Sequence, residues 1–339
     1  MKIAFDVMGG DYCPQESVKG AILALKKHKD LELVLVGDEE KIKEIIEKNN
    51  YDGARLEIVN ALDVITCNES PVEAFRTKPE SSLVKTFDLA RANNEISAII
   101  SSGSTGALFT AAVTKVRRIE GVKQRPALAP LLPTIRGGKV MLLDSGANVD
   151  ATAENLVQYA LLGHAYMKSV EKIDNPRIAL LNIGVEEKKG EKLTIETYQL
   201  LKQRKDIHFV GNVEARDVLS GDYDVVVCDA FAGNVLIKTL EGTVSIVNSQ
   251  IKEGIKKNPL RMLGYLLSRG AYKELKRNFS TKNVGGAVFL GVQKVIVKAH
   301  GNSKAENFVT AIEQTIELVS KNLVENVREI INNSGEEND

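Results

Sequence analysis

The sequence has few cysteines, no charge imbalance and no long apolar run. Its three cysteines, Cys13, Cys67 and Cys228, are far apart and form neither a CxxC pair nor a cysteine–histidine cluster, so we expect reduced thiols and no metal site. Lysine plus arginine and aspartate plus glutamate each number 45, which argues against a broad nucleic-acid-binding face. No run of about 18 apolar residues occurs, and the N-terminus MKIAFDVMGGD is unlike a signal peptide. We therefore expect a cytoplasmic protein with no membrane-spanning helix.

The motifs of four common protein classes are also missing. No GxGxxG follows the first expected strand, which argues against a dinucleotide site, and no GxxxxGK[ST] loop for an ATP phosphate is present. Neither GxSxG nor HExxH occurs, which disfavours serine hydrolases and zinc proteases. What is present is ordinary globular composition: 339 residues, 43% hydrophobic and 27% charged, enough for one large domain or two smaller ones.

Short apolar runs alternate with longer amphipathic segments along the chain. The runs predict strands at 2–6, 31–36, 55–59, 98–101, 140–144, 178–182, 208–210, 225–228 and 295–299. The segments between them predict helices at 16–27, 39–48, 82–92, 108–117, 154–167, 193–204, 235–252 and 305–332. This alternation is typical of an α/β, Rossmann-like fold, in which helices cover both faces of a mainly parallel sheet. We expect one elongated domain over 1–332, with two lobes sharing the sheet as one arrangement, and a frayed tail over 333–339.

The informative feature is the set of residue types that follow the strands. Glycine accompanied by aspartate, asparagine or serine occurs in seven such turns: DVMGGD at 6–11, SSGSTG at 101–106, DSGANVD at 144–150, NIG at 182–184, GN at 211–212, CDAFAGN at 228–234 and HGNS at 300–303. In an open parallel sheet, ligands bind beyond the carboxyl ends of the strands, where glycine allows close backbone approach and helix N-termini attract anions. One such turn is ordinary, but seven predict an oxyanion- or phosphate-binding crevice without identifying its ligand.

At these turns the sequence resembles the PlsX-type phosphate acyltransferases of bacterial phospholipid synthesis. The resemblance is carried, in one order between residues 3 and 305, by IAFDVMGGDYCP, SPVEAFRTKPESS, IISSGSTGAL, RPALAPLLPT, LLDSGANVDATAENLVQYALLG, LLNIGVEEKKGEKLT, FVGNVEARD, VVVCDAFAGNVLIKTLEG and VGGAVFLGVQKVIVKAHGNSKA. The chain departs from it at Ala215 and Ala230, where glycine is expected. The resemblance implies a three-layer α/β/α fold like that of isopropylmalate dehydrogenase, a homodimer, and no metal or organic cofactor.

The resemblance also implies a reaction. An acyl group passes from long-chain acyl-[acyl carrier protein] to inorganic phosphate, which gives acyl phosphate and free carrier protein. A membrane acyltransferase then uses the acyl phosphate to acylate glycerol 3-phosphate. The implied partners are therefore acyl carrier protein, phosphate and, functionally, that membrane enzyme. The implied location is the cytoplasm, in peripheral association with the inner face of the cell membrane.

A thioester is already activated, so phosphate can attack it directly, and the site needs only a cation and neutral donors. Within LLNIGVEEKKG we expect Lys189 to bind phosphate or the oxyanion; Lys188 is the alternative, and a solvated lysine is the ordinary interpretation. Asn234 is the second candidate, as an oxyanion donor or as the cap of the following helix. The remaining candidates for shaping the site or for binding phosphate and substrate are Asp6, Gly10, Asp11, Ser104, Thr105, Asp144, Asn148, Asn212, Asp229 and His300.

Several of these residues have a structural alternative. Asp144 and Asp229 fit either the orientation of Lys189 or helix capping, and His300 fits either protonation of the leaving thiolate or an ordinary turn. Cys228, at a strand end, fits a small buried hydrophobic residue.

The character of the chain changes over residues 251–278. Eight basic and two acidic residues give this segment a net charge of +6, and Leu260, Leu263 and Leu267 follow helical spacing. A basic amphipathic segment of this kind binds an anionic membrane surface or an acidic carrier protein, and a helix at a dimer interface or in the core is the structural alternative. The residues expected to make this contact are Leu260, Leu263, Leu266, Leu267, Lys256, Lys257 and Arg261.

Three other functions remain open at this point. A short-chain phosphate acyltransferase that uses acetyl-CoA shares the phosphate nucleophile, and a chain-length series of acyl donors separates it from the long-chain enzyme. A dehydrogenase of the same fold predicts NAD binding and a metal-binding acid cluster, which the motifs do not supply. A non-catalytic adaptor on the membrane surface predicts no phosphate-dependent loss of the acyl thioester.

Overall fold

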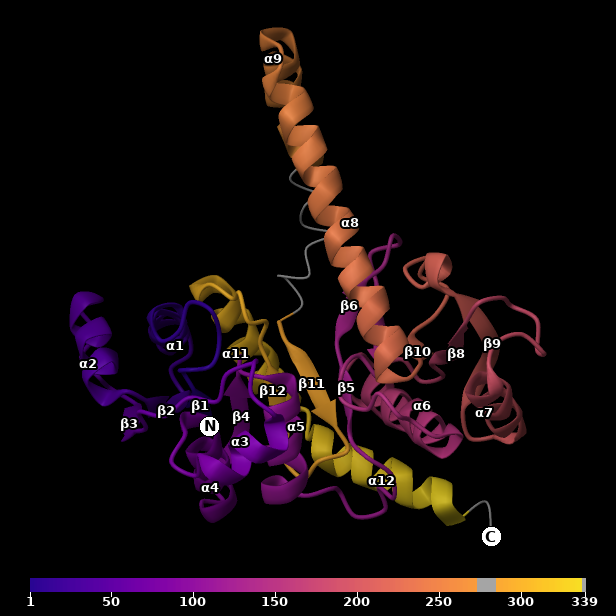
Figure 1. Ribbon diagram of the computed structural model, residues 1–339, viewed down its shortest axis with the longest axis horizontal. Coiled ribbons are helices and arrows are strands. Elements are labelled where there is room, and N and C mark those ends of the chain that lie inside the picture. Colours follow the sequence, from indigo (N-terminus) through magenta and orange to yellow (C-terminus); the bar gives the residue numbers. More distant parts are fainter. Residues whose placement is uncertain (273–284, 337–339) are drawn as a thin grey trace.

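The computed structural model describes residues 1–272 and 285–336, and two β-sheets form its framework (Figure 1). In the described residues, one sheet has seven strands in the order β3-β2-β1-β4-β12-β11-β5, and the other has five in the order β6-β7-β10-β8-β9. The strands of the first sheet are β1 (Lys2–Asp6), β2 (Glu32–Gly37), β3 (Leu56–Asn60), β4 (Ile96–Ser101), β5 (Ala127–Ala129), β11 (Ala287–Leu290) and β12 (Val295–Lys298). Those of the second are β6 (Leu131–Pro133), β7 (Lys139–Leu143), β8 (Arg177–Asn182), β9 (His208–Glu214) and β10 (Val225–Val227).

Most strand pairs are parallel, which confirms the expected sheet type. Among the described strands, the antiparallel pairs are β11 with β12, β11 with β5, and β6 with β7. The central strand β10 consists of three fully buried valines, as expected for a parallel strand covered on both faces. The sequence analysis missed β5, β6 and β11, because runs of three or four residues carry too little pattern to separate a strand from a loop.

One extended segment joins the two sheets. β5 pairs with β11 in the first sheet and β6 pairs with β7 in the second, and only Pro130 separates β5 from β6. The carbonyl oxygen of Pro130 accepts a hydrogen bond from the backbone N–H of Leu142 at 3.1 Å. Proline has no N–H to donate, so it suits the point at which the segment leaves one ladder and joins the other. The chain therefore has two lobes with separate sheets, not two lobes that share one sheet.

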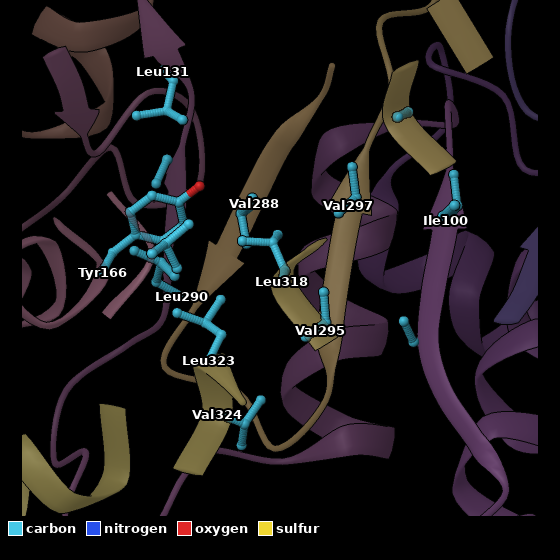
Figure 2. Packing of buried hydrophobic residues seen from close by; sticks show 14 of the residues in the cluster. Ile100, Leu131, Tyr166, Val288, Leu290, Val295, Val297, Leu318, Leu323 and Val324 are labelled. Carbon is cyan, nitrogen blue, oxygen red and sulfur yellow. The ribbon is translucent and has the colours of Figure 1, made fainter. Parts of the chain in front are cut away.

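Helices cover the sheets and complete three layers. They are α1 (Gln15–Lys27), α2 (Glu39–Lys48), α3 (Pro71–Thr77), α4 (Ser82–Ala92), α5 (Thr105–Ala111) with a π-helical turn at Ala112–Val116, α6 (Ala153–Ser169), α7 (Lys192–Gln203), α8 (Ala230–Lys256), α9 (Pro259–Leu267), α11 (Ala305–Ser320) and α12 (Leu323–Glu336). One apolar cluster crosses from one sheet to the other; Figure 2 shows it extending from Ile100 in β4 to Leu131 in β6 and Tyr166 in α6. Two further clusters fill the opposite faces, one under α4 and α5 and one under the base of α8. The three-layer α/β fold expected from the sequence is confirmed.

Helix boundaries follow capping residues where the sequence supplies them. α2 begins after Asp38, whose side chain accepts a hydrogen bond from the backbone N–H of Lys41, and α6 begins with a capping box of Thr152 and Asn155. The helix expected over 305–332 is instead two helices, α11 and α12, separated at Asn322, which has a φ of 50°. α12 continues to Glu336, into the segment expected to be frayed, and residues 337–339 lie outside the described chain.

α8 and α9 form an arm that projects from the body (Figure 1). α8 has 27 residues, a length of about 40 Å, and begins five residues before the expected start. Its buried residues are Ala230, Gly233 and Leu236, all in the first two turns, and α9 has none. By length and composition alone α8 is long and apolar enough to cross a membrane, with a mean hydropathy of 1.2 over an 18-residue window. Its base, however, is packed into the protein body.

Candidate active site

A cavity of about 550 Å³ lies between the two lobes at the base of α8. Four parallel strands each place one residue in its wall shortly after their carboxyl ends: Thr105 after β4, Ser145 after β7, Asn234 after β10 and His300 after β12. The remaining wall comes from the segment that joins the sheets and from one face of α8. The cavity therefore occupies the crevice position at which open parallel sheets bind ligands.

One end of the cavity is charged. Lys298 ends β12 with its Nζ 3.4 Å from the carbonyl oxygen of Ala299, and burial lowers the pKa of its amine. On α8, Lys238 lies 3.0 Å from Glu241, which also lies 3.4 Å from Nε2 of His300. The hydrogen bond with His300, followed by that with Lys238, lowers the pKa of Glu241 to about 2. Within residues 1–272 and 285–336 no carboxylate pairs with Lys298, so its positive charge is available to an anion.

The rest of the cavity wall is largely apolar. Ile237, Leu240 and Val244 lie on one face of α8, because their spacing of three and four residues matches the helical repeat. Leu131, Leu132 and Leu219 of the second lobe line the same cavity. A charged end continuous with an apolar wall suits a ligand that has an anionic group and a hydrocarbon chain.

The base of α8 is fixed against the loop that follows β7. The Asp229 carboxylate accepts a hydrogen bond from the backbone N–H of Ala232 at 2.9 Å and caps the helix. A Cβ on Gly233 would overlap the carbonyl oxygen of Asp144, so only glycine allows this approach. Cys228 is buried and donates to the same carbonyl oxygen at 3.3 Å, which confirms it as a small buried residue. Asn234 therefore lies inside α8, not at its cap, and is exposed to the cavity.

Asp144 organises the loop after β7. Its Oδ1 accepts the backbone N–H groups of Leu128, Ser145, Gly146 and Ala147, and its Oδ2 accepts both the backbone N–H and the Nδ2 of Asn148. Asp144 is fully buried; burial raises its pKa, and these hydrogen bonds oppose that rise. Both carboxylate oxygens of Asp144 are thus occupied by hydrogen bonds within the loop. The structure therefore does not show the expected role of Asp144 in orienting Lys189 or a ligand.

The buried amide of Asn148 serves the same loop. Its Nδ2 donates to the carbonyl oxygen of Pro126 at 2.7 Å, and its side chain lies outside the cavity wall. Asp144 and Asn148 therefore position Ser145, which does line the cavity.

The turn after β1 contacts the turn after β12 but does not itself line the cavity. Asp6 accepts hydrogen bonds from Oγ of Ser101 at 2.7 Å and from the backbone N–H of Met8 at 3.2 Å, and burial raises its pKa. Gly10 has a φ of 116°, and the next residue, Asp11, donates its backbone N–H to the carbonyl oxygen of Gly301 at 2.8 Å. None of Asp6, Gly10 or Asp11 lines the cavity, but together they hold the turn that carries His300.

The expected phosphate donors of the second turn are split between two positions. Ser104 is buried and immediately precedes α5, where its side chain makes no capping hydrogen bond. Thr105, the first residue of α5, lines the cavity. Of the two, only Thr105 is placed where it contacts a ligand directly.

Lys189 lies in the loop after β8, away from this cavity. Nδ2 of Asn182 donates to the carbonyl oxygen of Lys189 at 2.9 Å, and Nδ2 of Asn212 donates to that of Glu186 at 3.0 Å. The Lys189 side chain is exposed and does not line the cavity that Asn234 lines. Asn212 thus shapes the Lys189 loop, and the two main candidates of the sequence analysis, Lys189 and Asn234, do not line one cavity.

The cavity has no evident metal centre. In the described ranges no group of three or more histidine, cysteine, aspartate or glutamate side chains is arranged to hold a metal ion. The two buried carboxylates near the strand ends, Asp6 and Asp144, are each engaged by backbone or hydroxyl donors of their own loops. The groups positioned to meet a ligand are instead amines, an imidazole, neutral donors and the carboxylate of Glu241, which pairs with Lys238 and His300.

Comparison with known proteins places the chain in a family. A family described as "Fatty acid synthesis protein" matches residues 1–326. A phosphate acyltransferase of Clostridium perfringens (strain SM101 / Type A) is 45% identical over 331 residues, which cover 98% of this chain and 97% of that protein. One of Thermoanaerobacter pseudethanolicus is 41% identical over 337 residues, which cover 99% of each. The chain belongs to the PlsX-type phosphate acyltransferase family.

Similarity among solved structures is confined to the fold. A phosphotransacetylase of Streptococcus pyogenes superposes with a TM-score of 0.61 at 17% sequence identity, over 96% of this chain and 94% of that one. At that identity the match supports the two-lobed α/β architecture and does not extend to individual site residues.

The charged end of the cavity was not among the features predicted from the sequence. Lys298 ends the strand sequence VIVK, and a lysine closing an otherwise apolar strand is the signal that marks it. Lys238 and Glu241 follow Asn234 by four and seven residues, which places all three on one face of α8. Recognising this face requires the start of α8 at Ala230, which the expected helix did not include.

Proposed function

We propose that the protein converts long-chain acyl-[acyl carrier protein] and inorganic phosphate to acyl phosphate and free carrier protein, and so supplies glycerol-3-phosphate acylation in phospholipid synthesis. Membership of the phosphate acyltransferase family supports the reaction type. The observation that carries the proposal is the cavity itself, in which Lys298, with no carboxylate partner in the described part of the chain, is continuous with an apolar wall along α8. A phosphate and a fatty acyl chain need these two environments side by side.

Phosphate binds at the charged end in this proposal. The Lys298 ammonium group, with little solvent and no carboxylate partner among residues 1–272 and 285–336, attracts phosphate more strongly than an exposed lysine does. Asn234 and Thr105 add neutral donors from α8 and α5. Glu241 is ionised and held by His300 and Lys238, so it balances part of the positive charge and limits trapping of the phosphate.

The acyl chain lies along Ile237, Leu240 and Val244, with its thioester carbonyl next to the phosphate. A phosphate oxygen attacks the carbonyl carbon, the C–O bond forms, and the C–S bond to the carrier's thiol breaks. The oxyanion formed between these steps is stabilised by Lys298 and the neutral donors. His300, 3.4 Å from Glu241, supplies a proton to the departing thiolate. No covalent enzyme intermediate is required.

Lys189 remains a proposed participant because its loop is exposed and rigidly held. The two asparagine side chains that anchor the loop leave the Lys189 amine directed to solvent near the carboxyl end of β8. We assign it the role of a second cation, which meets phosphate on approach. The remaining candidate residues act through the loops they hold. They are Asp229, Asp144, Asn148, Asn212, Asp6, Gly10, Asp11 and Ser104.

The arm is the proposed contact with the membrane, the carrier and a second copy of the chain. Leu260, Leu263, Leu266 and Leu267 of α9 are 75%, 54%, 62% and 82% exposed, and nothing in the described body covers them. Lys256, Lys257 and Arg261 flank them, and residues 273–278 of the expected segment lie outside the described chain. A basic, apolar tip suits an anionic membrane surface, and the exposed apolar face of α8 suits packing in a homodimer. The location that follows is cytoplasmic, peripheral to the inner face of the membrane.

The direct test is phosphate-dependent acyl phosphate formation from long-chain acyl-[acyl carrier protein]. Lys298→Met keeps the side-chain volume and removes the charge, and we expect a loss of about 10²- to 10³-fold in kcat/KM. Lys189→Ala is compared with it, and Lys26→Met, an exposed lysine on α1, is the matched control. Full activity of Lys298→Met removes Lys298 from the mechanism, and full activity of Lys189→Ala removes Lys189. A wild-type preference for acetyl-CoA over the long-chain carrier substrate would replace the proposed function with the short-chain one.

A further inference from the structure

A second cavity, of about 620 Å³, lies at the opposite edge of the seven-stranded sheet. It opens at the amino ends of β4 and β12, between the end of α4, the π-helical turn after α5 and the junction of α11 with α12. Strand β12 links the two cavities, because Lys294 immediately precedes it in this cavity and Lys298 ends it in the other, about 13 Å further along. The two cavities share no lining residue.

The charge of the second cavity is strongly one-sided. Five basic side chains and one acidic side chain line it: Arg91, Lys115, Arg117, Lys294, Arg328 and Glu325. Lys115 pairs with Asp88 at 2.7 Å, and Lys294 donates to the carbonyl oxygens of Ile96 and Asn93. In the part of the chain that the structure describes, no carboxylate forms an ion pair with Arg91, Arg117 or Arg328. Like charges gathered in a concave site attract an anion more strongly than the same charges spread over a convex surface do.

The backbone at this cavity is also strained. Arg117 ends the π-helical turn with a φ of 71°, in the left-handed region that side chains with a Cβ rarely adopt. Single π-helical turns and left-handed non-glycine residues are both enriched at binding sites. Here the unusual backbone brings Arg117 to the cavity wall, opposite the α11–α12 junction that supplies Arg328.

Polar groups make up most of the surface of this cavity. Ile96, Val295 and Leu323 are each almost fully buried and line it beneath the basic side chains. A volume of about 620 Å³ is in the usual range of about 300–1,000 Å³ for small-molecule sites, and is several times what one phosphate ion needs. Arginine guanidinium groups bind phosphate oxygens in a bidentate manner, and the volume leaves room for an organic group attached to the phosphates.

We propose that this second cavity binds a small organic molecule that carries two or more phosphate groups and is about the size of a nucleotide. The site is separate from the cavity that holds Lys298, and strand β12 connects the two. This proposal does not depend on the acyltransferase reaction.

The test is calorimetric titration of the full-length protein with ATP as the probe, without divalent cations. We expect binding by the wild type that weakens as salt is added, and a loss of at least about tenfold in affinity for Arg117→Gln plus Arg328→Gln. The matched control is Lys19→Gln plus Lys26→Gln, which removes two exposed charges from α1 and should leave the affinity unchanged. Lys298→Met should also leave it unchanged.

Absence of ATP binding to the wild type overturns the proposal, and so does wild-type affinity in Arg117→Gln plus Arg328→Gln. Loss of binding in Lys298→Met overturns it as well, because the probe then occupies the catalytic cavity. Far-ultraviolet circular dichroism and acyl phosphate formation show whether the arginine double variant is folded. If it is not, Arg91→Gln, at the exposed end of α4, is the second variant, and the same loss of affinity is expected from it.

Discussion

The base of α8 and its outer part belong to one helix but have opposite surroundings. At the base, Ala230, Gly233 and Leu236 are buried against the loop after β7, and the next turns line the candidate active-site cavity. Beyond Ser245 the helix has no buried residue, and Ile246 and Val247 are exposed (Figure 1). The hydrophobic face of α8 therefore lines the cavity at one end of the helix. At the other end it is exposed and free to pack against another surface. The two ends should respond differently to equivalent substitutions.

The sharpest comparison uses two glycines of α8. A Cβ at Gly233 would overlap the carbonyl oxygen of Asp144, whereas a Cβ at Gly242 meets nothing within 4 Å. We expect Gly233→Ala to destabilise the protein by about 1–3 kcal/mol through overpacking, and to lower activity because Asn234 moves with the helix. Gly242→Ala should raise the unfolding free energy by up to about 1 kcal/mol, through helix propensity alone. Urea unfolding followed by circular dichroism measures both.

The two glycine variants are controls for each other. Equal effects at both positions would mean that the base is no more tightly packed than the arm. A large destabilisation by Gly242→Ala would instead reveal a partner surface on the arm, for example a second copy of the chain. In that case the change should depend on protein concentration.

A second comparison concerns the tip of the arm and its shaft. Leu263→Glu plus Leu267→Glu places two charges among the exposed apolar residues of α9, and we expect binding to anionic liposomes to fall by about tenfold or more. Asn248→Glu plus Gln250→Glu adds the same charge to exposed positions of α8 and should have a smaller effect. Liposome co-sedimentation measures binding, and acyl phosphate formation from soluble substrate should stay unchanged in both variants. Unchanged co-sedimentation of the α9 variant would remove the tip as the membrane contact.

The framework of the fold could be predicted from the sequence, whereas the candidate active-site cavity could be predicted only in part. The nine expected strands occur because each is a run of apolar residues long enough to carry a pattern, as in Lys2–Asp6. Lys189 and Lys298 both follow or end such strands, and nothing local separates them. What separates them is sheet order: β12 is an inner strand of its sheet and its carboxyl end faces the other lobe, whereas β8 is next to the outer strand β9. Sheet order is set by long-range packing, which a single sequence does not display.

The smallest expected effect is in the pH dependence of phosphate use. Burial lowers the pKa of Lys298 below its ordinary value of 10.5, and the protonated amine is the form that attracts phosphate. As the pH rises through that lowered pKa, the cation is lost and the KM for phosphate increases. We expect kcat/KM for phosphate to fall on the alkaline side of the profile in the wild type, at a lower pH than the titration of an ordinary lysine would give. Lys298→Arg keeps its charge at these pH values, so any activity it retains should lack this fall.

Glu241 adds no step to the same profile, because its pKa of about 2 leaves it ionised throughout. The ionisation of phosphate itself is common to both enzymes and cancels when the wild type is divided by Lys298→Arg. If the ratio of wild-type to Lys298→Arg activity does not vary with pH, the titrating group is not Lys298.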